Sequence, residues 1–345
     1  MMYCLNDYPL QSLNSFKVPA YAAHYIRLNR LKDIEGFYTA VDIRKKPLYI
    51  LGGGSNTLFV SNFPGYILHV QLSGIEIIEE THYKVLIKAA AGVPWHTLVL
   101  FCVNKGYGGI ENLSLIPGTV GGASIQNIGA YGIELKDVLD TIEAIALSTG
   151  QKIIFKSSAC GFGYRTSFFK TKWHNQYLIT HITLAVHKEK VFSIGYETIQ
   201  AMLEKMKIKQ LSFKAISDAI IAIRKQKLPD PTILGNAGSF FQNPLVPIAH
   251  YQWLKEQYPS IIAFKTEDIE QIKISAAWLI ETAGFKGLRK GSAGVYGSHA
   301  LILVNYGGAT GKDIISLASQ IKKKVKIQFN ITLIPEVNMV GGVIK

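Results

Sequence analysis

The chain has 345 residues, of which 48% are hydrophobic and 18% are charged. This length suits two or three domains, and the composition excludes a largely disordered chain. No apolar run approaches the roughly 18 residues that span a bilayer, and Asn6 and Asp7 stand where a signal peptide would be apolar. We therefore expect a cytoplasmic protein that does not contact a membrane.

The formal net charge of +13 is compatible with a nucleic-acid partner, but it suits a substrate that carries a pyrophosphate equally well. The lysines are scattered, and the dense run at 322–324 falls on a predicted helix whose other face is apolar. We interpret this run as a solvated helix face and expect no nucleic acid. Cys4, Cys102 and Cys160 form no C-x-x-C pair, which predicts free thiols and no metal site.

Residues 1–72 alternate short apolar segments with turns, which predicts a small α+β lobe. The expected elements are a helix at 29–35, strands at 47–50, 58–60 and 66–70, and a turn at Pro64-Gly65.

The strand at 47–50 runs into a glycine-rich stretch, Leu51-Gly52-Gly53-Gly54-Ser55-Asn56. Glycine permits positive φ and lets backbone amides converge on one anion, and the serine and asparagine add side-chain donors. The stretch is a candidate phosphate cradle. A glycine-rich hairpin turn is the alternative.

Residues 73–227 predict a second lobe with longer strands. A helix at 95–105 has Pro94 at its first position and Gly106 after its end, so the local signals agree with the apolar pattern. The other expected elements are strands at 83–90 and 178–187, a hairpin of 140–147 with 151–155, and helices at 196–206 and 215–225.

A second glycine-rich stretch, residues 115–132, lies within this lobe. Its small residues allow a flat ring to lie against the backbone, and Thr119, Ser124 and Asn127 supply hydrogen-bonding groups. Two such loops, about sixty residues apart, can hold opposite ends of one dinucleotide. The chain has no G-x-G-x-x-G and no P-loop motif, which argues against a Rossmann fold and P-loop chemistry.

The proline-rich segment 228–231 predicts a linker into a third lobe, residues 228–336, after which 337–345 return to the first lobe. There we expect helices at 275–283 and 312–325 and strands at 301–304 and 329–334, the last of which ends at Pro335-Glu336.

Five motifs occur in an order that resembles one family. They are LGGGSN from Leu51, IPGTVGGASIQNIGAYG from Ile116, Gly163-Tyr164-Arg165, the segment 235–241, and Pro335-Glu336-Val337. Over roughly residues 15–341 the chain resembles the UDP-N-acetylenolpyruvoylglucosamine reductases, in the longer type that carries a tyrosine in an inserted segment. The resemblance implies an α+β, vanillyl-alcohol oxidase-type FAD-binding fold of two lobes plus a separate α+β substrate-binding domain.

The resemblance also implies an activity, the NADPH-dependent reduction, through FAD, of the enolpyruvyl group of a UDP-sugar for bacterial peptidoglycan. It makes Ser239 the proton donor, while Arg165 and Glu336 stabilise the enolate. From the residues alone, Ser239 reads as a turn serine and Glu336 as a surface carboxylate, and Arg165 is as readily a member of an ion pair; their assignments rest on the resemblance. No G-x-S-x-G surrounds the serine, which argues against a hydrolase nucleophile.

The resemblance further implies the contacts of cofactor and substrate. FAD is expected at Gly52, Gly53, Gly54, Ser55, Asn56, Pro117, Gly118, Thr119, Gly122, Ala123, Asn127 and Gly129, and substrate at Tyr196, Lys227 and Asn243. Neither loop contains His or Cys, so we expect noncovalent FAD. His299 stands where many relatives have glutamine, and we interpret it as a surface histidine. We expect a monomer; a flavin-dependent oxidase acting on an alcohol or sugar is the alternative function.

Overall fold

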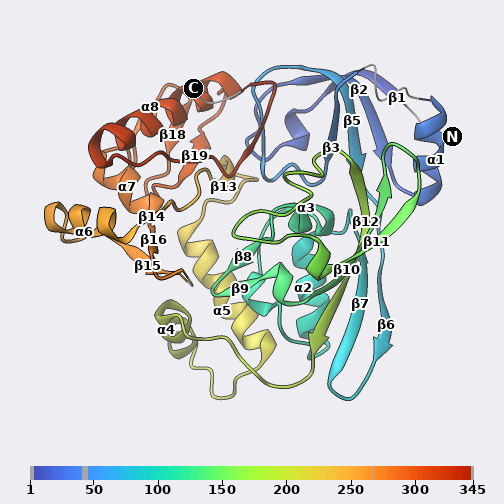
Figure 1. Ribbon diagram of the computed structural model, residues 1–345, viewed down its shortest axis with the longest axis horizontal. Helices are drawn as coiled ribbons and strands as arrows, with labels where there is room; N and C mark the ends of the chain where they lie inside the picture. The colour runs from blue at the N-terminus through green and yellow to red at the C-terminus, as the bar shows by residue number, and fades with distance from the viewer. Residues whose placement is uncertain (1–3, 41–45, 267, 343–345) are drawn as a thin grey trace. The chain divides into compact units, whose positions relative to one another are not determined.

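The computed structural model describes residues 4–40, 46–266 and 268–342, and these form two compact units (Figure 1). Unit 1 comprises Met1–Tyr8, Ala22–Gly54 and Pro64–Gln226, and unit 2 comprises Pro9–Tyr21, Ser55–Phe63 and Lys227–Lys345. The division after Gln226 falls one residue from the predicted start of the third lobe. The finer division of unit 1 into two lobes stays a prediction.

Unit 1 contains two main sheets. The first has the order β1-β2-β5-β3, with β1 at Cys4–Pro9, β2 at Tyr21–Leu28, β5 at Phe63–Val70 and β3 at Leu48–Leu51. The second has the order β11-β10-β12-β7-β6, with β11 at Lys152–Lys156, β10 at Leu139–Ala146, β12 at Tyr177–His187, β7 at Lys84–Ala90 and β6 at Ile75–Glu80. Every neighbouring pair in the second sheet is antiparallel, and β10 with β11 confirms the predicted hairpin.

One face of the five-stranded sheet packs on the main hydrophobic core, because apolar and charged residues alternate along its strands. Ile142 and Leu184 are fully buried, whereas Glu143 on the opposite face forms a salt bridge with Lys88. Helices α2 (Trp95–Asn104) and α3 (Val120–Ile125) contribute to this core. Trp95 is fully buried and donates its indole N–H to the Leu113 carbonyl oxygen at 3.0 Å, so its one polar group is satisfied.

Three further helices belong mainly to unit 1. They are α1 (Leu31–Ala40), α4 (Glu197–Lys205) and α5 (Phe213–Lys227). The α4 and α5 pair shares a small core of its own, made by Ile199, Met202, Leu203, Ile216, Ala219, Ile220 and Ile223. These residues recur every three or four positions, which is the spacing of one helix face.

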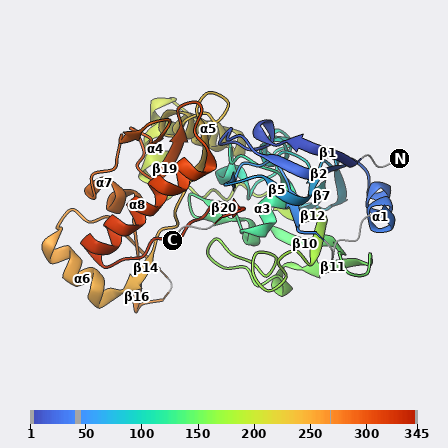
Figure 2. The same cartoon turned by 90° about the horizontal axis from the view of Figure 1, so that it is seen from above.

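Unit 2 is built on the sheet β13-β19-β18-β17, with β13 at Gly235–Ser239, β19 at Ile302–Asn305, β18 at Ala293–Val295 and β17 at Arg289–Lys290. Helix α8 (Gly311–Phe329) packs against β18 and β19 (Figure 2). Helix α6 (Ile248–Gln257) packs against a small sheet with the order β14-β16-β15, whose strands are β14 Leu245–Pro247, β16 Gln271–Ile274 and β15 Ala263–Lys265. Helix α7 (Ala276–Thr282) packs against α8. Strand β20 (Asn338–Val340) pairs in parallel with β4 (Thr57–Phe59), so the end of the chain returns to the segment after the first glycine loop.

Helix α8 carries the lysine run. It begins with a capping box in which Thr310 Oγ1 accepts from the Asp313 N–H at 3.3 Å and Asp313 Oδ2 accepts from the Thr310 N–H at 2.8 Å. Its buried face includes Ile314, Leu317, Ala318, Ile321, Val325 and Phe329, and Lys323 and Lys324 are exposed. The predicted helix with a solvated lysine face is confirmed.

Three local predictions are wrong. The strand expected at 329–334 is absent from the described chain there, because α8 continues to Phe329 and Asn330 ends it with a φ of +55°. Ile331 and Leu333 of this segment are buried without ladder pairing. Pro64-Gly65 lies within β5 rather than in a turn, and Pro94 is the N-cap of α2 rather than its first residue.

Candidate functional site

The two predicted glycine loops touch each other in unit 1. A Cβ added to Gly52 would lie 2.6 Å from Thr119 Oγ1, and one added to Gly53 would lie 3.2 Å from the Gly118 Cα. Gly54 has a φ of +63°, which residues with side chains rarely adopt. The missing Cβ atoms thus leave room for the backbones to approach, which is the geometry that a cradle for a dinucleotide needs.

The second loop is fixed by its own neighbours. Gly118 has a φ of +114°, and its carbonyl oxygen accepts from the Trp95 N–H at 2.9 Å. Gly121 donates its N–H to the Ala91 carbonyl oxygen at 2.9 Å, and a Cβ on it would lie 2.8 Å from the Ala91 Cβ. The loop is therefore tied to both the core helix α2 and the end of β7.

Asn127 joins the second loop to the segment that carries Arg165. Its side chain is fully buried, and its Nδ2 donates to Glu134 Oε2 at 2.8 Å and to the Gly163 carbonyl oxygen at 3.1 Å. Its Oδ1 accepts from the Lys136 N–H at 3.0 Å. Both the nitrogen and the oxygen of the Asn127 side chain thus have hydrogen-bond partners within the protein. A direct contact of Asn127 with a cofactor stays a prediction.

Arg165 lies in a tight hairpin of unit 1. Gly163 and Thr166 exchange backbone hydrogen bonds around it, and Arg165 has a φ of +53°. Its guanidinium is half-buried and donates to the Gly129 carbonyl oxygen at 2.8 Å, so it contacts the second glycine loop. After the hairpin, Phe168 and Trp173 pack in an aromatic cluster; its other members are Phe155, Phe169 and Tyr177.

The sequence analysis did not single out Arg224, which supplies a second guanidinium in unit 1. Burial lowers the pKa of Arg224, which lies on α5, and the nearby Arg165 lowers it further, whereas Tyr131 opposes the shift. The Nε of Arg224 is buried and has no hydrogen-bond partner within the described part of the chain. Two like charges that interact repel each other, and an anion between them would relieve this repulsion. The only signal in the sequence was an arginine next to the apolar face of a predicted helix.

Tyr196 lies beside Tyr131, the tyrosine that opposes the pKa shift of Arg224. It precedes α4, is 47% exposed, and its ring meets that of Tyr131 edge-on with centroids 5.7 Å apart. The buried Asn112 donates to the Tyr131 and Ser193 carbonyl oxygens, each at 2.9 Å, and so holds the two tyrosine segments together. The contact of Tyr196 with substrate stays a prediction.

Two of the three predicted catalytic residues lie on neighbouring segments of unit 2. Ser239 ends β13 and is followed by Phe240, whose carbonyl oxygen accepts from the Glu336 N–H at 2.8 Å. The Asn56 side chain donates to the Glu336 carbonyl oxygen at 3.2 Å. Gly238, before the serine, has a φ of +69° and donates its N–H to Asn236 Oδ1 at 2.9 Å. Arg165, the third predicted residue, belongs to unit 1.

The predicted substrate residues Lys227 and Asn243 also lie in unit 2. Lys227 is exposed at the end of α5, and Asn243 Oδ1 accepts from the Ala276 N–H at 2.9 Å. His299 is half-buried rather than fully exposed. Burial lowers the pKa of His299, and Lys227 and Lys286 lower it further, which places this ring among cations.

A buried histidine behind the first loop gives a prediction for stability. Burial, and then Arg27, lowers the pKa of His69 to about 4, from 6.5 in an unfolded chain. Between these values the unfolded chain binds the extra proton, so stability is lost as the pH falls from about 6.5 towards 4. Going from pH 7 to pH 5 should cost about 2 kcal/mol through His69 alone.

Urea denaturation of the full chain at both pH values measures this loss. His69→Gln removes the titrating ring, and the variant should lose correspondingly less stability between the two pH values. An unchanged pH dependence in the variant would contradict the assignment.

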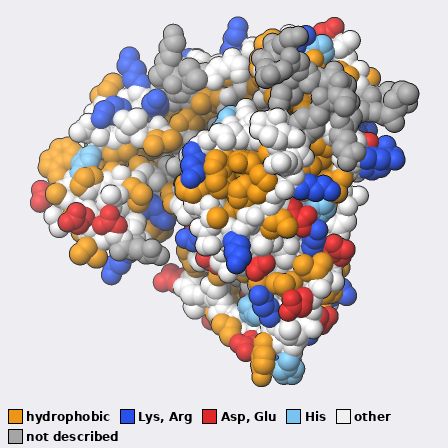
Figure 3. All heavy atoms as spheres, turned by 45° about the vertical axis from the view of Figure 1, so that its right-hand side comes forward, with side chains coloured by type: hydrophobic (Ala, Val, Ile, Leu, Met, Phe, Trp, Pro, Cys, Tyr) orange, Lys and Arg blue, Asp and Glu red, His pale blue; other side chains and the backbone are white. Residues whose placement is uncertain are grey.

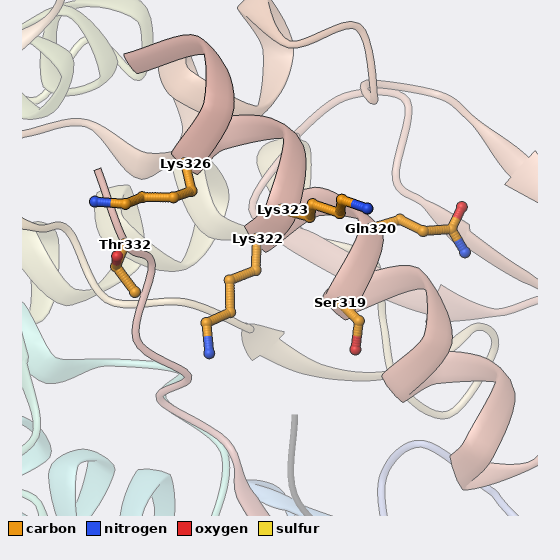
Figure 4. A pocket seen from close by; sticks show the side chains of 6 residues that line it. All are labelled: Ser319, Gln320, Lys322, Lys323, Lys326 and Thr332. Atoms are coloured by element: carbon orange, nitrogen blue, oxygen red, sulfur yellow. The ribbon is translucent and has the colours of Figure 1, made fainter. Parts of the chain in front are cut away.

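Three lysines of the run and its neighbourhood line a pocket on helix α8. The pocket, of about 360 Å³, is lined by Ser319, Gln320, Lys322, Lys323, Lys326 and Thr332, and Figure 4 shows its three amino groups pointing in different directions. On the face drawn in Figure 3, basic side chains are interspersed with acidic ones. Among the described residues no group of His, Cys, Asp or Glu is placed to hold a metal. Of the helices in the same ranges, none is both long and apolar enough to cross a bilayer.

The chain is similar to known proteins over nearly its whole length. Family models match residues 22–154 (FAD binding domain) and 230–340 (UDP-N-acetylenolpyruvoylglucosamine reductase, C-terminal domain). The UDP-N-acetylenolpyruvoylglucosamine reductase of Amoebophilus asiaticus is 46% identical over 332 residues, which cover 96% of this chain and 98% of the relative. That of Flavobacterium johnsoniae is 39% identical and covers 97% and 99%.

Solved structures agree on the fold. The UDP-N-acetylenolpyruvylglucosamine reductase of Thermus caldophilus matches with a TM-score of 0.67 at 21% identity, over 98% of both chains. A solvent-stable cholesterol oxidase matches with a TM-score of 0.50 at 11% identity, over 97% of this chain and 87% of its own. These matches confirm the predicted α+β, vanillyl-alcohol oxidase-type FAD-binding fold with a separate C-terminal domain. Together with the identities of the relatives, they show that the chain belongs to the UDP-N-acetylenolpyruvoylglucosamine reductase family.

Proposed function

We propose that the chain reduces the enolpyruvyl group of UDP-N-acetyl-3-O-(1-carboxyvinyl)-glucosamine to UDP-N-acetylmuramate, with FAD as cofactor and NADPH as the hydride donor. The observation that carries this proposal is the hydrogen bond between Glu336 and Phe240, which holds a carboxylate segment beside Ser239. Both segments lie in the domain matched by the reductase-specific family model. An oxidase of the same fold has no need of a proton donor for a carbon–carbon double bond.

The glycine loops fit an FAD pyrophosphate and ring, because side chains at Gly52 and Gly53 would occupy the space where the two backbones meet. The residues proposed to hold FAD, noncovalently, are those predicted from the two loops: Gly52, Gly53, Gly54, Ser55, Asn56, Pro117, Gly118, Thr119, Gly122, Ala123, Asn127 and Gly129. When bound, FAD accepts a hydride from NADPH and supplies one to the substrate. Arg165, which contacts Gly129, would then lie at the border between the cofactor loop and the substrate.

Each proposed catalytic residue meets one need of the reaction. Ser239 supplies a proton to the carbon that receives no hydride. Arg165 offers fixed donors to the substrate carboxylate as negative charge develops there, and Arg224 adds a second cation. Glu336 polarises the same centre. Ser239 needs such neighbours because a serine hydroxyl is a weak acid in water.

Substrate binding is proposed at Tyr196, Lys227 and Asn243. Lys227 supplies a cation for the diphosphate of the substrate. Tyr196, whose ring contacts that of Tyr131, is proposed to contact the diphosphate as well. The half-buried His299, whose pKa is lowered by the charge of Lys227, is a further polar group proposed for substrate binding. We propose that the protein acts as a monomer in the cytoplasm, without nucleic acid or a membrane as partner.

The purified protein is expected to be yellow and to release FAD on denaturation. NADPH should bleach the colour, and the enolpyruvyl UDP-sugar should restore it without oxygen, because the two half-reactions share one cofactor. Absorption at the flavin band during stepwise anaerobic addition measures both steps. A colourless protein free of FAD would contradict the proposal. Rapid oxygen-driven turnover of an alcohol or sugar, with no recolouring by the UDP-sugar, would replace it with the oxidase.

A further inference from the structure

The second glycine loop begins with a strained residue, Leu115. Its φ is +57°, a left-handed value that residues with a side chain adopt uncommonly. Such strain persists only where neighbouring groups fix the backbone, and it is common at ligand sites. The preceding residue, Ser114, is fixed by its hydroxyl, which donates to the Glu111 carbonyl oxygen at 2.6 Å. Leu115 stands two residues before Pro117, where FAD is proposed to bind.

The first residues of helix α2 hold both ends of this strained segment. His96 Nδ1 accepts from the Leu115 N–H at 3.0 Å. Trp95 donates its backbone N–H to the Gly118 carbonyl oxygen at 2.9 Å and its indole N–H to the Leu113 carbonyl oxygen at 3.0 Å. Of these three hydrogen bonds, the one to His96 is made by the strained residue itself. All of these residues belong to unit 1.

The direction of this hydrogen bond determines the tautomer of His96. A backbone N–H can only donate, so Nδ1 is the unprotonated nitrogen and the proton of the neutral ring is on Nε2. A ring protonated on both nitrogens would place its own N–H against that of Leu115. Burial, followed by the charges of Arg224 and Lys225, lowers the pKa of His96, which favours the neutral ring.

The acceptor at His96 offsets the cost of the left-handed backbone. Without it, Leu115 would keep the steric cost of positive φ and lose the hydrogen bond of its N–H, so the backbone would relax towards negative φ. Peptide groups are planar and rigid, so a rotation at Leu115 would displace the backbone of Pro117 and Gly118. These are residues against which the cofactor is expected to lie.

We propose that His96 is a positioning residue that holds Leu115 in its left-handed conformation and so keeps the backbone of residues 115–118 in the shape that binds FAD. The proposal rests on the proposed function only through the binding of FAD. Neither the UDP-sugar nor its reduction enters it.

The first test compares two replacements of His96 that have the same branched shape. Leu has no acceptor, whereas Asn carries its side-chain oxygen near the position of Nδ1. His96→Leu should weaken FAD binding about tenfold, and His96→Asn should stay within about threefold of the parent. Dilution of the FAD-loaded full chain, followed by the recovery of flavin fluorescence, measures the dissociation constant. Equal losses in His96→Leu and His96→Asn would overturn the proposal.

The second test changes the strained residue. Leu115→Gly and Leu115→Ala both remove the side chain, but only glycine takes positive φ without steric cost. With His96 present, the two variants should bind FAD within about twofold of each other, because the binding conformation is already populated. With His96→Leu, the glycine variant should bind FAD about threefold or more tightly than the alanine variant. If His96 only stabilised helix α2, its replacement would leave the difference between glycine and alanine unchanged, which would contradict the proposal.

His24 gives a matched control in unit 1. Its ring is also half-buried and hydrogen-bonded, with its Nδ1 2.8 Å from Asn6 Oδ1, but it lies on β2, in the other sheet of the unit. His24→Leu should leave the FAD dissociation constant within about twofold of the parent. An equal loss of FAD affinity in His24→Leu and His96→Leu would overturn the proposal.

A further variant keeps the test decisive if His96→Leu does not fold. His96→Ala also removes the acceptor and places a strong helix former on α2. It should bind FAD clearly more weakly than His96→Asn, and equal affinities of the two would overturn the proposal. A chain that binds FAD and fails to reduce the UDP-sugar contradicts the proposed function and leaves this result intact.

Discussion

Ser239→Ala is expected to abolish one half-reaction and spare the other. NADPH should reduce the flavin at the parent rate, while reoxidation by the enolpyruvyl UDP-sugar should slow by about 10²- to 10⁴-fold, the usual contribution of a positioned general acid. The separation follows because the hydride transfer from NADPH requires no proton from the protein. Stopped-flow absorption at the flavin band resolves the two steps.

Two comparison variants sharpen this experiment. Ser239→Cys keeps a proton donor at the same position and should retain more reoxidation than the alanine variant. Ser260→Ala removes an exposed serine elsewhere in unit 2 and should change neither step. If Ser239→Ala slowed both half-reactions equally, the serine would have only a structural role in the turn at Gly238. This result would contradict its role as the proton donor.

The structure around Ser239 also shows what sequence can and cannot predict. The motif around Ser239 was recognisable because its turn is formed by neighbouring residues. Gly238 has a positive φ, and its N–H donates to the Asn236 side chain. The position of Glu336 beside Phe240 depends on a backbone pairing between segments about a hundred residues apart. No local pattern encodes such a pairing, so the sequence supplied only the type of residue.

The same distinction explains the errors and omissions. Helix α2 was predicted closely because its apolar spacing and its Pro94 and Gly106 signals are local. The segment after Phe329 was assigned wrongly because alternating apolar residues indicate burial as well as a strand. Arg224 and His69 were missed because their importance lies in burial and in distant partners, Arg165 for one and Tyr25 for the other.

The glycine loops stand between these cases. Their composition predicted close approach of a ligand to the backbone, and the contact of Gly52 with Thr119 is consistent with that chemistry. The sequence of either loop alone does not predict that the two loops contact each other. This contact follows from the core, which fixes the second loop through the bonds of Gly118 and Gly121 to Trp95 and Ala91.

Replacement of Arg165 should have the second-largest effect. In Arg165→Met, reoxidation by the UDP-sugar is expected to slow by about 10²- to 10³-fold, as when one fixed donor to a developing anion is removed. Arg165→Lys keeps the charge without the planar pair of donors and should recover part of the rate. Arg289→Met is the control, because it removes the same charge from the chain at a different place. The Arg289 guanidinium lies in unit 2, 4.5 Å from the centre of the Tyr306 ring.

The contact between Arg165 and Gly129 makes a rival explanation testable in the same variants. The guanidinium donates to the Gly129 carbonyl oxygen at 2.8 Å, so its loss also loosens the second glycine loop. If this structural role dominated, Arg165→Met would release FAD and would slow reduction by NADPH as much as reoxidation. If Arg165 acts on the substrate carboxylate, FAD stays bound, reduction by NADPH proceeds at the parent rate, and the deficit is confined to the step in which negative charge develops on the UDP-sugar.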